Sequence, residues 1–249
     1  MIKSFLQFIN EDMDLKPEFI KGLAQNLIDR LRTSPSDEST EYSVFAGMQF
    51  SEPFEFDLIL KFRREVNPDI DTDSHFNKLP WEKINFDDLG YAIDANTKMN
   101  KSKSKIPSIT IHILINPKEE PSLYRKLYYR LLDILTHETN HLNQLGLNRE
   151  PFNTDVSNMK DRDASKKSYK YFLLPDEVES MVEGMYARSK SEHRNLDQIF
   201  NDYLQPFIES EYITISEYWL VMRVWVKSAL ELYPDARFSN NVRSIINSI

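Results

Sequence analysis

The stretch from residue 131 to residue 146 reads LLDILTHETNHLNQLG, and its leucine and isoleucine residues recur at the spacing of an α-helix. The same pattern begins near Pro121, and Gly146 marks the expected end of the helix. The five residues HETNH, from His137 to His141, therefore lie near the C-terminal end of a long helix. Histidines four residues apart on a helix project from one face, so both imidazoles can reach a single metal ion.

Glu138 directly follows the first of these histidines. From this position its carboxylate can reach a metal-bound water and accept a proton as the water attacks a carbonyl group. The chain has 5 histidines. A chance H-E-x-x-H is therefore expected about 0.01 times per chain, which makes the motif fairly specific. A pair of surface histidines that holds no metal is the alternative interpretation.

The composition excludes several classes of protein. The chain has 249 residues and no cysteine, so a metal must be held by His, Asp or Glu, and Zn²⁺ is the expected ion. A net charge of -8 argues against nucleic acid and anionic membranes as partners. No apolar run approaches the length of a membrane span, and the N-terminus lacks a secretory signal peptide. We therefore expect a cytoplasmic protein that is not secreted.

The order of the predicted elements indicates an α+β fold, because a few strands precede a run of helices. We expect a first helix over residues 17–33 and four strands, over residues 42–50, 54–63, 89–97 and 108–117. After the motif helix, further helices are expected over residues 173–190, 196–210, 216–233 and 238–249. This gives one domain over residues 13–249, with a sheet part over about 42–117 and a helical part over about 118–249.

Zinc in a hydrolytic site usually has three protein ligands and an open position for water, so a third ligand should follow the motif. The extension HExxHxxGxxH needs glycine and histidine where this chain has Gln144 and Leu147. The remaining histidines, His75, His112 and His193, fit ordinary core or surface positions. We therefore look for the third ligand among downstream carboxylates.

The motif HETNH, together with the run ESMVE at residues 179–183, resembles the gluzincin (thermolysin-like) zinc metallopeptidases. In that group the third ligand is a Glu on a later helix. The resemblance implies Glu179 as the ligand, Ser180 as the small residue that follows it, and Glu183 as a hydrogen-bond partner of a zinc-bound histidine. Glu183 and Glu177 are the alternatives for the ligand, although we expect Glu177 to point to a different face from Glu179.

The resemblance implies a zincin-like fold, with a small, mostly antiparallel sheet packed on the active-site helix and a helical C-terminal half. It implies a zinc metalloendopeptidase in which His137, His141 and Glu179 hold Zn²⁺ and Glu138 is the general base and then the proton donor. A peptide or protein is the expected substrate, bound in extended form by addition to the strand at residues 108–115.

The N-terminal residues MIKSFLQFINE resemble the capsid-targeting leader of internal head proteins in large tailed bacteriophages. Ile9, Asn10 and Glu11 match the pattern that the prohead protease cleaves. The resemblance implies a leader over residues 1–12 and a protein packaged in a phage virion. An ordinary amphipathic N-terminal helix is the alternative for these residues. The second functional class is a catalytically inactive zincin-like binding or structural protein of the virion.

Overall fold

The computed structural model describes residues 15–34, 40–49, 53–72, 80–98, 107–144, 168–242 and 245. The predicted leader at residues 1–12 lies outside this part of the chain. The elements, in chain order, are α2 (Leu15–Thr33), β1 (Thr40–Gln49), β2 (Pro53–Arg64), α3 (Pro80–Leu89), β3 (Tyr91–Lys98), β4 (Ser108–Ile115), α4 (Glu120–Gln144), η3 (Tyr169–Leu173), α6 (Pro175–Glu192), α7 (Leu196–Glu209), α8 (Ile215–Leu232) and η4 (Asn240–Val242).

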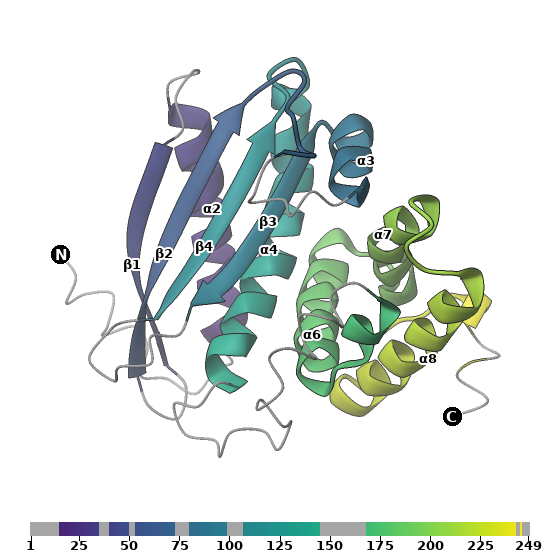
Figure 1. Ribbon diagram of the computed structural model, residues 1–249. Coiled ribbons are helices and arrows are strands. Elements are labelled where there is room, and N and C mark those ends of the chain that lie inside the picture. Colours follow the sequence, from purple (N-terminus) through teal and green to yellow (C-terminus); the bar gives the residue numbers. More distant parts are fainter. Residues whose placement is uncertain are drawn as a thin grey trace.

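The four strands form one sheet in the order β1-β2-β4-β3. The pairs β1–β2 and β3–β4 are antiparallel, whereas β2 and β4 are parallel. The sheet is therefore mostly antiparallel, and it is followed along the chain by helices only (Figure 1). This confirms the predicted α+β class with a helical C-terminal half.

Strand β4 lies inside the sheet and is hydrogen-bonded to β2 on one side and to β3 on the other. The expectation that residues 108–115 bind a substrate strand is therefore wrong, because neither edge of β4 is open. The outer strand beside it is β3. The sequence of β4, SITIHILI, is buried along almost its whole length. Burial extends to Thr110 and His112, which alternate with the isoleucines, as expected for a strand that is covered on both faces.

Helices α2 and α4 cover one face of the sheet (Figure 1). Alternate side chains of β4, including Ile109, Ile111 and Ile113, point to this face, since successive residues of a strand alternate between faces. They pack with buried leucines of α4 such as Leu131 and Leu135. Burial of this apolar stripe fixes the rotation of α4 about its axis and leaves its polar stripe facing the helical half.

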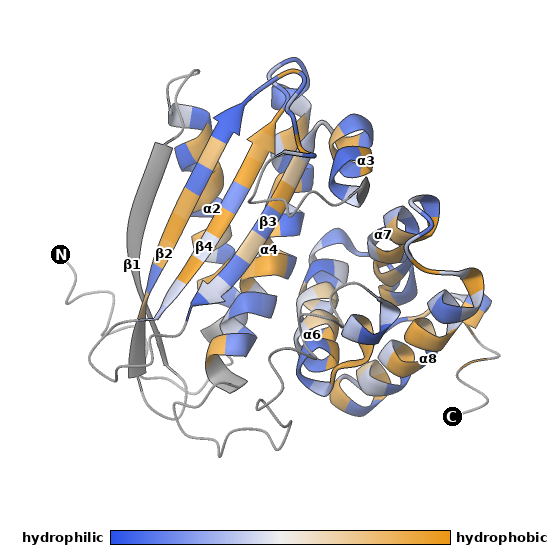
Figure 2. Ribbon diagram, in the orientation of Figure 1, coloured by the Kyte–Doolittle hydropathy of each residue, from blue (hydrophilic) through white to orange (hydrophobic). Residues whose placement is uncertain are grey.

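Helices α6, α7 and α8 form the second half of the molecule around a separate apolar cluster (Figures 1 and 2). Trp225 of α8 is fully buried in this cluster, and its indole Nε1 donates a hydrogen bond to the carbonyl oxygen of Phe172, 2.9 Å away. Val178, Val182 and Met185 give α6 its buried side in the cluster. The other side of α6 packs against α4, so the two halves meet along these two helices.

Two local predictions differ from the structure. Helix α3 was not predicted, and it covers β3 near Phe86 and Ala92, which belong to a small third apolar cluster. The helix expected over residues 238–249 is replaced, in its described part, by the short 3-10 helix η4. No helix in the described ranges combines the length and the apolar character that a membrane crossing requires.

Candidate metal centre

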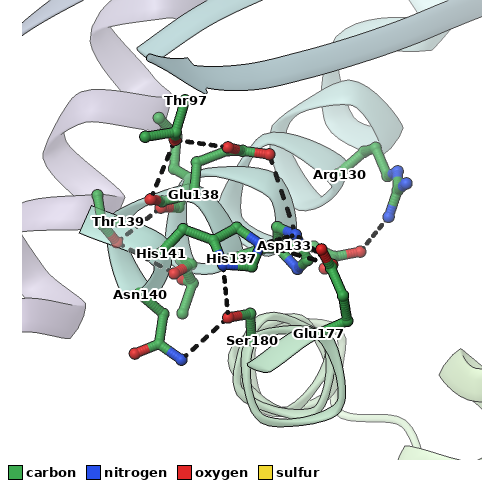
Figure 3. Close-up of polar contacts among 12 residues, drawn as sticks. Thr97, Arg130, Asp133, His137, Glu138, Thr139, Asn140, His141, Glu177 and Ser180 are labelled. Atoms are coloured by element: carbon green, nitrogen blue, oxygen red, sulfur yellow. Dashed lines mark hydrogen bonds and ion pairs between the residues drawn. The ribbon is translucent and has the colours of Figure 1, made fainter. Parts of the chain in front are cut away.

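Helix α4 presents a polar stripe to α6, made of Arg130, Asp133, His137 and His141 (Figure 3). These residues are spaced by three or four positions, so they lie along one face of the helix. Arg130 donates a hydrogen bond to Asp133, one turn before His137. The predicted i and i+4 arrangement of the two histidines is present, and both imidazoles are half-buried at the junction of the two halves.

Helix α6 supplies an acidic group to the same place. Pro175 is its first residue, where a proline is well tolerated because its missing N–H would be unsatisfied anyway. Glu177 lies in this first turn and is 2% exposed. A carboxylate near the N-terminus of a helix is favoured by the unpaired N–H groups there. Glu177, Ser180 and Gly184 lie three and four residues apart, so they share the face that α6 turns to α4.

Three ligand atoms converge between the two helices. The Nε2 atoms of His137 and His141 are 2.9 Å apart, and Glu177 Oε2 lies 3.6 Å from the first and 3.5 Å from the second. The point equidistant from these three atoms is about 1.9 Å from each, close to the 2.0–2.2 Å typical of zinc bonded to nitrogen or oxygen. The three side chains therefore form a group that could hold one metal ion.

The electrostatics keep His137 neutral. Burial and the nearby His141 lower the pKa of His137, against partial opposition from the Glu177 carboxylate, to about 3. A neutral imidazole has a free lone pair, which is the form that binds a metal. His137 is thus in its ligand form at neutral pH without losing a proton first.

A hydrogen-bonded pair of side chains fixes the second histidine. Ser180 Oγ lies 3.3 Å from His141 Nδ1, and Asn140 Nδ2 donates to the same Ser180 oxygen over 3.2 Å. Asn140 and Ser180 are both buried. Contacts of this kind at the far ring nitrogen orient a histidine and select the tautomer that leaves Nε2 as the ligand atom.

Glu138 is buried on the side of α4 that faces the outer strand β3 (Figure 3). The hydroxyl of Thr97, near the end of β3, donates a hydrogen bond to Glu138 Oε2 over 2.6 Å. Glu138 Oε1 is 4.0 Å from His137 Nε2. The carboxylate is therefore held between the edge of the sheet and the histidines, with one oxygen anchored and the other turned toward the ligand group.

Tyr171 of the short helix η3 is hydrogen-bonded to Glu177. Burial raises the pKa of its hydroxyl well above the ordinary value, and the neighbouring Glu177 and Glu138 carboxylates raise it further. A hydroxyl with this pKa stays protonated at neutral pH and is a hydrogen-bond donor. The structure therefore places a protonated hydroxyl beside the Glu177 carboxylate.

The expected third ligand was Glu179, but the group contains Glu177 instead. Two residues along an α-helix correspond to about 200° of rotation, so Glu179 points away from the face that carries Glu177. Glu183, expected to contact a zinc-bound histidine, is rotated off this face as well, and Ser180 is the α6 residue that contacts His141. The hydrogen-bonding role of Glu183 stays a prediction.

A pattern in the sequence could have favoured Glu177. The residues three and seven positions after it are Ser180 and Gly184, both small, whereas Glu179 is followed at these positions by Val182 and Tyr186. Small residues allow two helices to approach closely. A Cβ built on Gly184 would lie 2.5 Å from the carbonyl oxygen of Asp133, which shows that α6 crosses α4 at this point.

No protein-family model, curated protein or solved structure matches the chain at a significant level. The assignment of the site therefore depends on the motif and on the geometry of its side chains.

Proposed function

We propose that the protein is a zinc-dependent peptidase whose ion is held by His137, His141 and Glu177. The convergence of these three ligand atoms on one point supports the proposal most strongly. The set of two imidazoles and one carboxylate is the ligand set of hydrolytic zinc sites, which leave the fourth position to water or substrate. When bound there, zinc lowers the pKa of water and polarises the carbonyl group of the substrate.

The residues around the ligands support a hydrolytic reaction. Glu138 accepts the proton of the attacking water and passes it to the leaving amine, as the gluzincin resemblance implies. Thr97 positions Glu138 by donating to Oε2, so that Oε1, 4.0 Å from His137 Nε2, is the oxygen that takes the proton. The protonated hydroxyl of Tyr171, close to Glu177 and Glu138, is suited to donate a hydrogen bond to the oxygen that gains charge during attack.

The open edge of β3 is the place where we expect an extended peptide to bind. Within the described part of the chain, β3 pairs only with β4, so its outer edge has backbone groups that a peptide strand can use. Thr97 ties this strand to Glu138. A peptide added to β3 therefore passes the general base, as hydrolysis requires.

The test combines metal content and activity. Purified protein is loaded with one equivalent of zinc and incubated with an unfolded protein and a peptide library. The wild type should cleave, and Glu138→Gln should retain zinc while losing cleavage by at least about a hundredfold. Glu231→Gln, a change at an exposed acid of α8 outside the ligand group, is the matched control and should keep both properties.

The same experiment separates the enzyme from an inactive zincin-like binding protein. If the wild type binds zinc but cleaves nothing, and Glu138→Gln changes no property of the protein, the peptidase proposal fails. If His137→Ala binds as much zinc as the wild type, the assignment of His137 as a zinc ligand is wrong.

A further inference from the structure

Ser180 is fully buried where α6 meets α4, next to the two histidines of the ligand group (Figure 3). A buried polar group costs stability unless its hydrogen bonds are satisfied, so the partners of Ser180 indicate its role. The hydroxyl and the backbone carbonyl of Ser180 contact different histidines. One residue of α6 therefore touches both of the ligands that α4 supplies.

The hydroxyl of Ser180 contacts His141. Ser180 Oγ lies 3.3 Å from His141 Nδ1, whereas His141 Nε2 belongs to the ligand group. A histidine that binds a metal through Nε2 carries its proton on Nδ1, and this N–H needs an acceptor. A serine oxygen has two lone pairs and can accept this hydrogen bond.

Asn140 holds the same hydroxyl from the side of α4. Asn140 is 2% exposed, and its Nδ2 atom donates to Ser180 Oγ over 3.2 Å. An amide N–H can only donate, so it uses one lone pair of the serine oxygen and leaves the other for His141 Nδ1. Asn140 thereby fixes the position of the acceptor that His141 requires.

The backbone of Ser180 contacts the other histidine. Burial lowers the pKa of His137, and a hydrogen bond to the Ser180 backbone acts in the opposite direction. An acceptor favours the protonated ring, so the partner is the carbonyl oxygen of Ser180. His137 Nε2 is 2.9 Å from His141 Nε2, which leaves His137 Nδ1 for the carbonyl. Backbone carbonyls are common partners of this nitrogen in metal-bound histidines.

Gly184 makes the Ser180 carbonyl accessible. In an α-helix the carbonyl of residue 180 accepts the N–H of residue 184, and a glycine there has no side chain to cover it. The same glycine lets α6 approach α4 so closely that an added Cβ would be 2.5 Å from the Asp133 carbonyl oxygen. His137 lies one turn after Asp133 on α4. The helix crossing therefore brings the Ser180 backbone to the ring of His137.

We propose that Ser180 is a positioning residue that aims both histidines at the ion. Its carbonyl orients His137, and its hydroxyl, held by Asn140, keeps His141 in the tautomer that has its proton on Nδ1 and a lone pair on Nε2. Ser180 acts through the ligands and does not contact the ion itself. The proposal rests on the zinc site of the proposed function but not on peptide hydrolysis.

The first experiment compares zinc affinity by competition with a coloured chelator. Ser180→Ala keeps the residue small and removes only the hydroxyl, so α6 can still approach α4. It should bind zinc about tenfold to a hundredfold more weakly, as is typical when a partner of a metal ligand is lost. The matched control is Ser189→Ala on the same helix, a buried serine whose hydroxyl donates to the Tyr186 carbonyl oxygen over 2.9 Å. This control should bind zinc as tightly as the wild type.

The second experiment uses NMR of the zinc-loaded protein with ¹⁵N-labelled histidine to observe the ring N–H groups directly. In the wild type, the Nδ1–H signals of His137 and His141 should both be protected from exchange with water. In Ser180→Ala the His141 signal should be lost to exchange, whereas the His137 signal should remain because the backbone carbonyl is unchanged. A general loosening of the site would affect both signals.

A second variant tests the same contact while leaving Ser180 in place. Asn140→Leu removes the donor to Ser180 Oγ and should weaken zinc binding less than Ser180→Ala does. Melting temperatures measured with a chelator show whether each variant is folded. If Ser180→Ala does not fold, Asn140→Leu decides the question, and wild-type affinity together with a protected His141 signal in that variant overturns the proposal.

The remaining outcomes separate this proposal from the function on which it rests. Wild-type zinc affinity in a folded Ser180→Ala, or equal loss of both histidine signals, contradicts the role of Ser180 and leaves the metal site standing. A wild-type protein that binds no zinc refutes the metal site and this proposal together. Zinc binding that depends on Ser180, without any cleavage of peptides, supports this proposal and refutes only the peptidase function.

Discussion

Gly184 of α6 lies against the backbone of Asp133 on α4, so closely that a Cβ at this position would be 2.5 Å from the Asp133 carbonyl oxygen and 2.7 Å from its Oδ1 atom. This contact sets the distance between the two helices. His137 is four residues after Asp133, and Glu177 is seven residues before Gly184. The crossing therefore determines how near the Glu177 carboxylate comes to the histidines.

Gly184→Ala should both destabilise the protein and weaken metal binding. The added methyl group meets backbone atoms that cannot move aside, and overpacking of this kind typically costs about 1–3 kcal/mol. The measurements are urea unfolding and zinc affinity. The matched control is Gly22→Ala on α2, where no atom lies within 4 Å of the added Cβ. This change should stabilise the protein by about 0.5–1 kcal/mol. If Gly184→Ala is as stable as the wild type, α4 and α6 can move apart at this contact without a loss of stability.

Glu177→Gln should lose most of the zinc, whereas Glu179→Gln should keep it. Among the residues that the structure describes, Glu177 is the one whose carboxylate lies within 3.6 Å of both histidine Nε2 atoms. The measurement is metal content after dialysis, together with the rise in melting temperature on adding zinc. At a hundred times the dissociation constant, a bound ligand stabilises a protein by about 2.7 kcal/mol. If Glu179→Gln loses zinc and Glu177→Gln keeps it, the third ligand is Glu179, as the sequence resemblance implied.

Thr97→Val should reduce the rate of cleavage about tenfold and leave the zinc content unchanged. The valine removes the hydrogen bond of 2.6 Å that orients Glu138 while keeping the size of the side chain. Thr97→Ser retains the hydroxyl and should restore most of the rate. The comparison is made on kcat with a single peptide. Full activity in the valine variant would show that Glu138 is positioned by other contacts.

The stability of the protein should respond to pH through Glu82. Its folded pKa is raised to about 8 from the ordinary value of 4.5, so the folded state binds a proton that the unfolded state has lost. Stability from this group is present below about pH 4.5 and decreases as the pH rises toward 8, by at most about 1.4 kcal/mol per pH unit. Glu82→Gln should lack this decrease.

Urea unfolding of both proteins at pH 5.5, 6.5, 7.5 and 8.5, with a chelator present, measures the difference. The chelator removes any contribution from bound metal, and His137 titrates in the same way in both proteins. Parallel pH profiles for the wild type and Glu82→Gln would show that the carboxyl group is well solvated.

The two histidines of the site could be predicted from the sequence because both lie on one helix, α4. The positions of His137 and His141 follow from a spacing of four residues, and the amphipathic pattern around them fixes the helix. The choice between Glu177 and Glu179 depends on which face of α6 meets α4. That face is set by contacts between residues far apart in the chain, such as Gly184 with Asp133.

The sheet also shows that local sequence patterns predict single elements but not how distant elements pair. The strands were predicted within about two residues of β1, β2 and β3, and β4 was predicted from its first residue. Their order does not follow from local patterns, so the sequence predicts β4 as the substrate-binding strand, although β3 is the outer strand beside it. The sequence of β4 gave no signal of its inner position, because Thr110 and His112 alternate with isoleucines as in a strand with one solvated face, although the structure buries both.

The ligands of the metal group come from two different hydrophobic cores. The apolar side of α4, with Leu131 and Leu135, belongs to the core of the sheet, whereas Val178 and Val182 of α6 belong to the core of the helical half. A chain in which only one half has folded can offer two of the ligands or one, never all three. Zinc bound by the complete set therefore reports that folding is finished, and any activity that requires it would begin only in a fully assembled molecule.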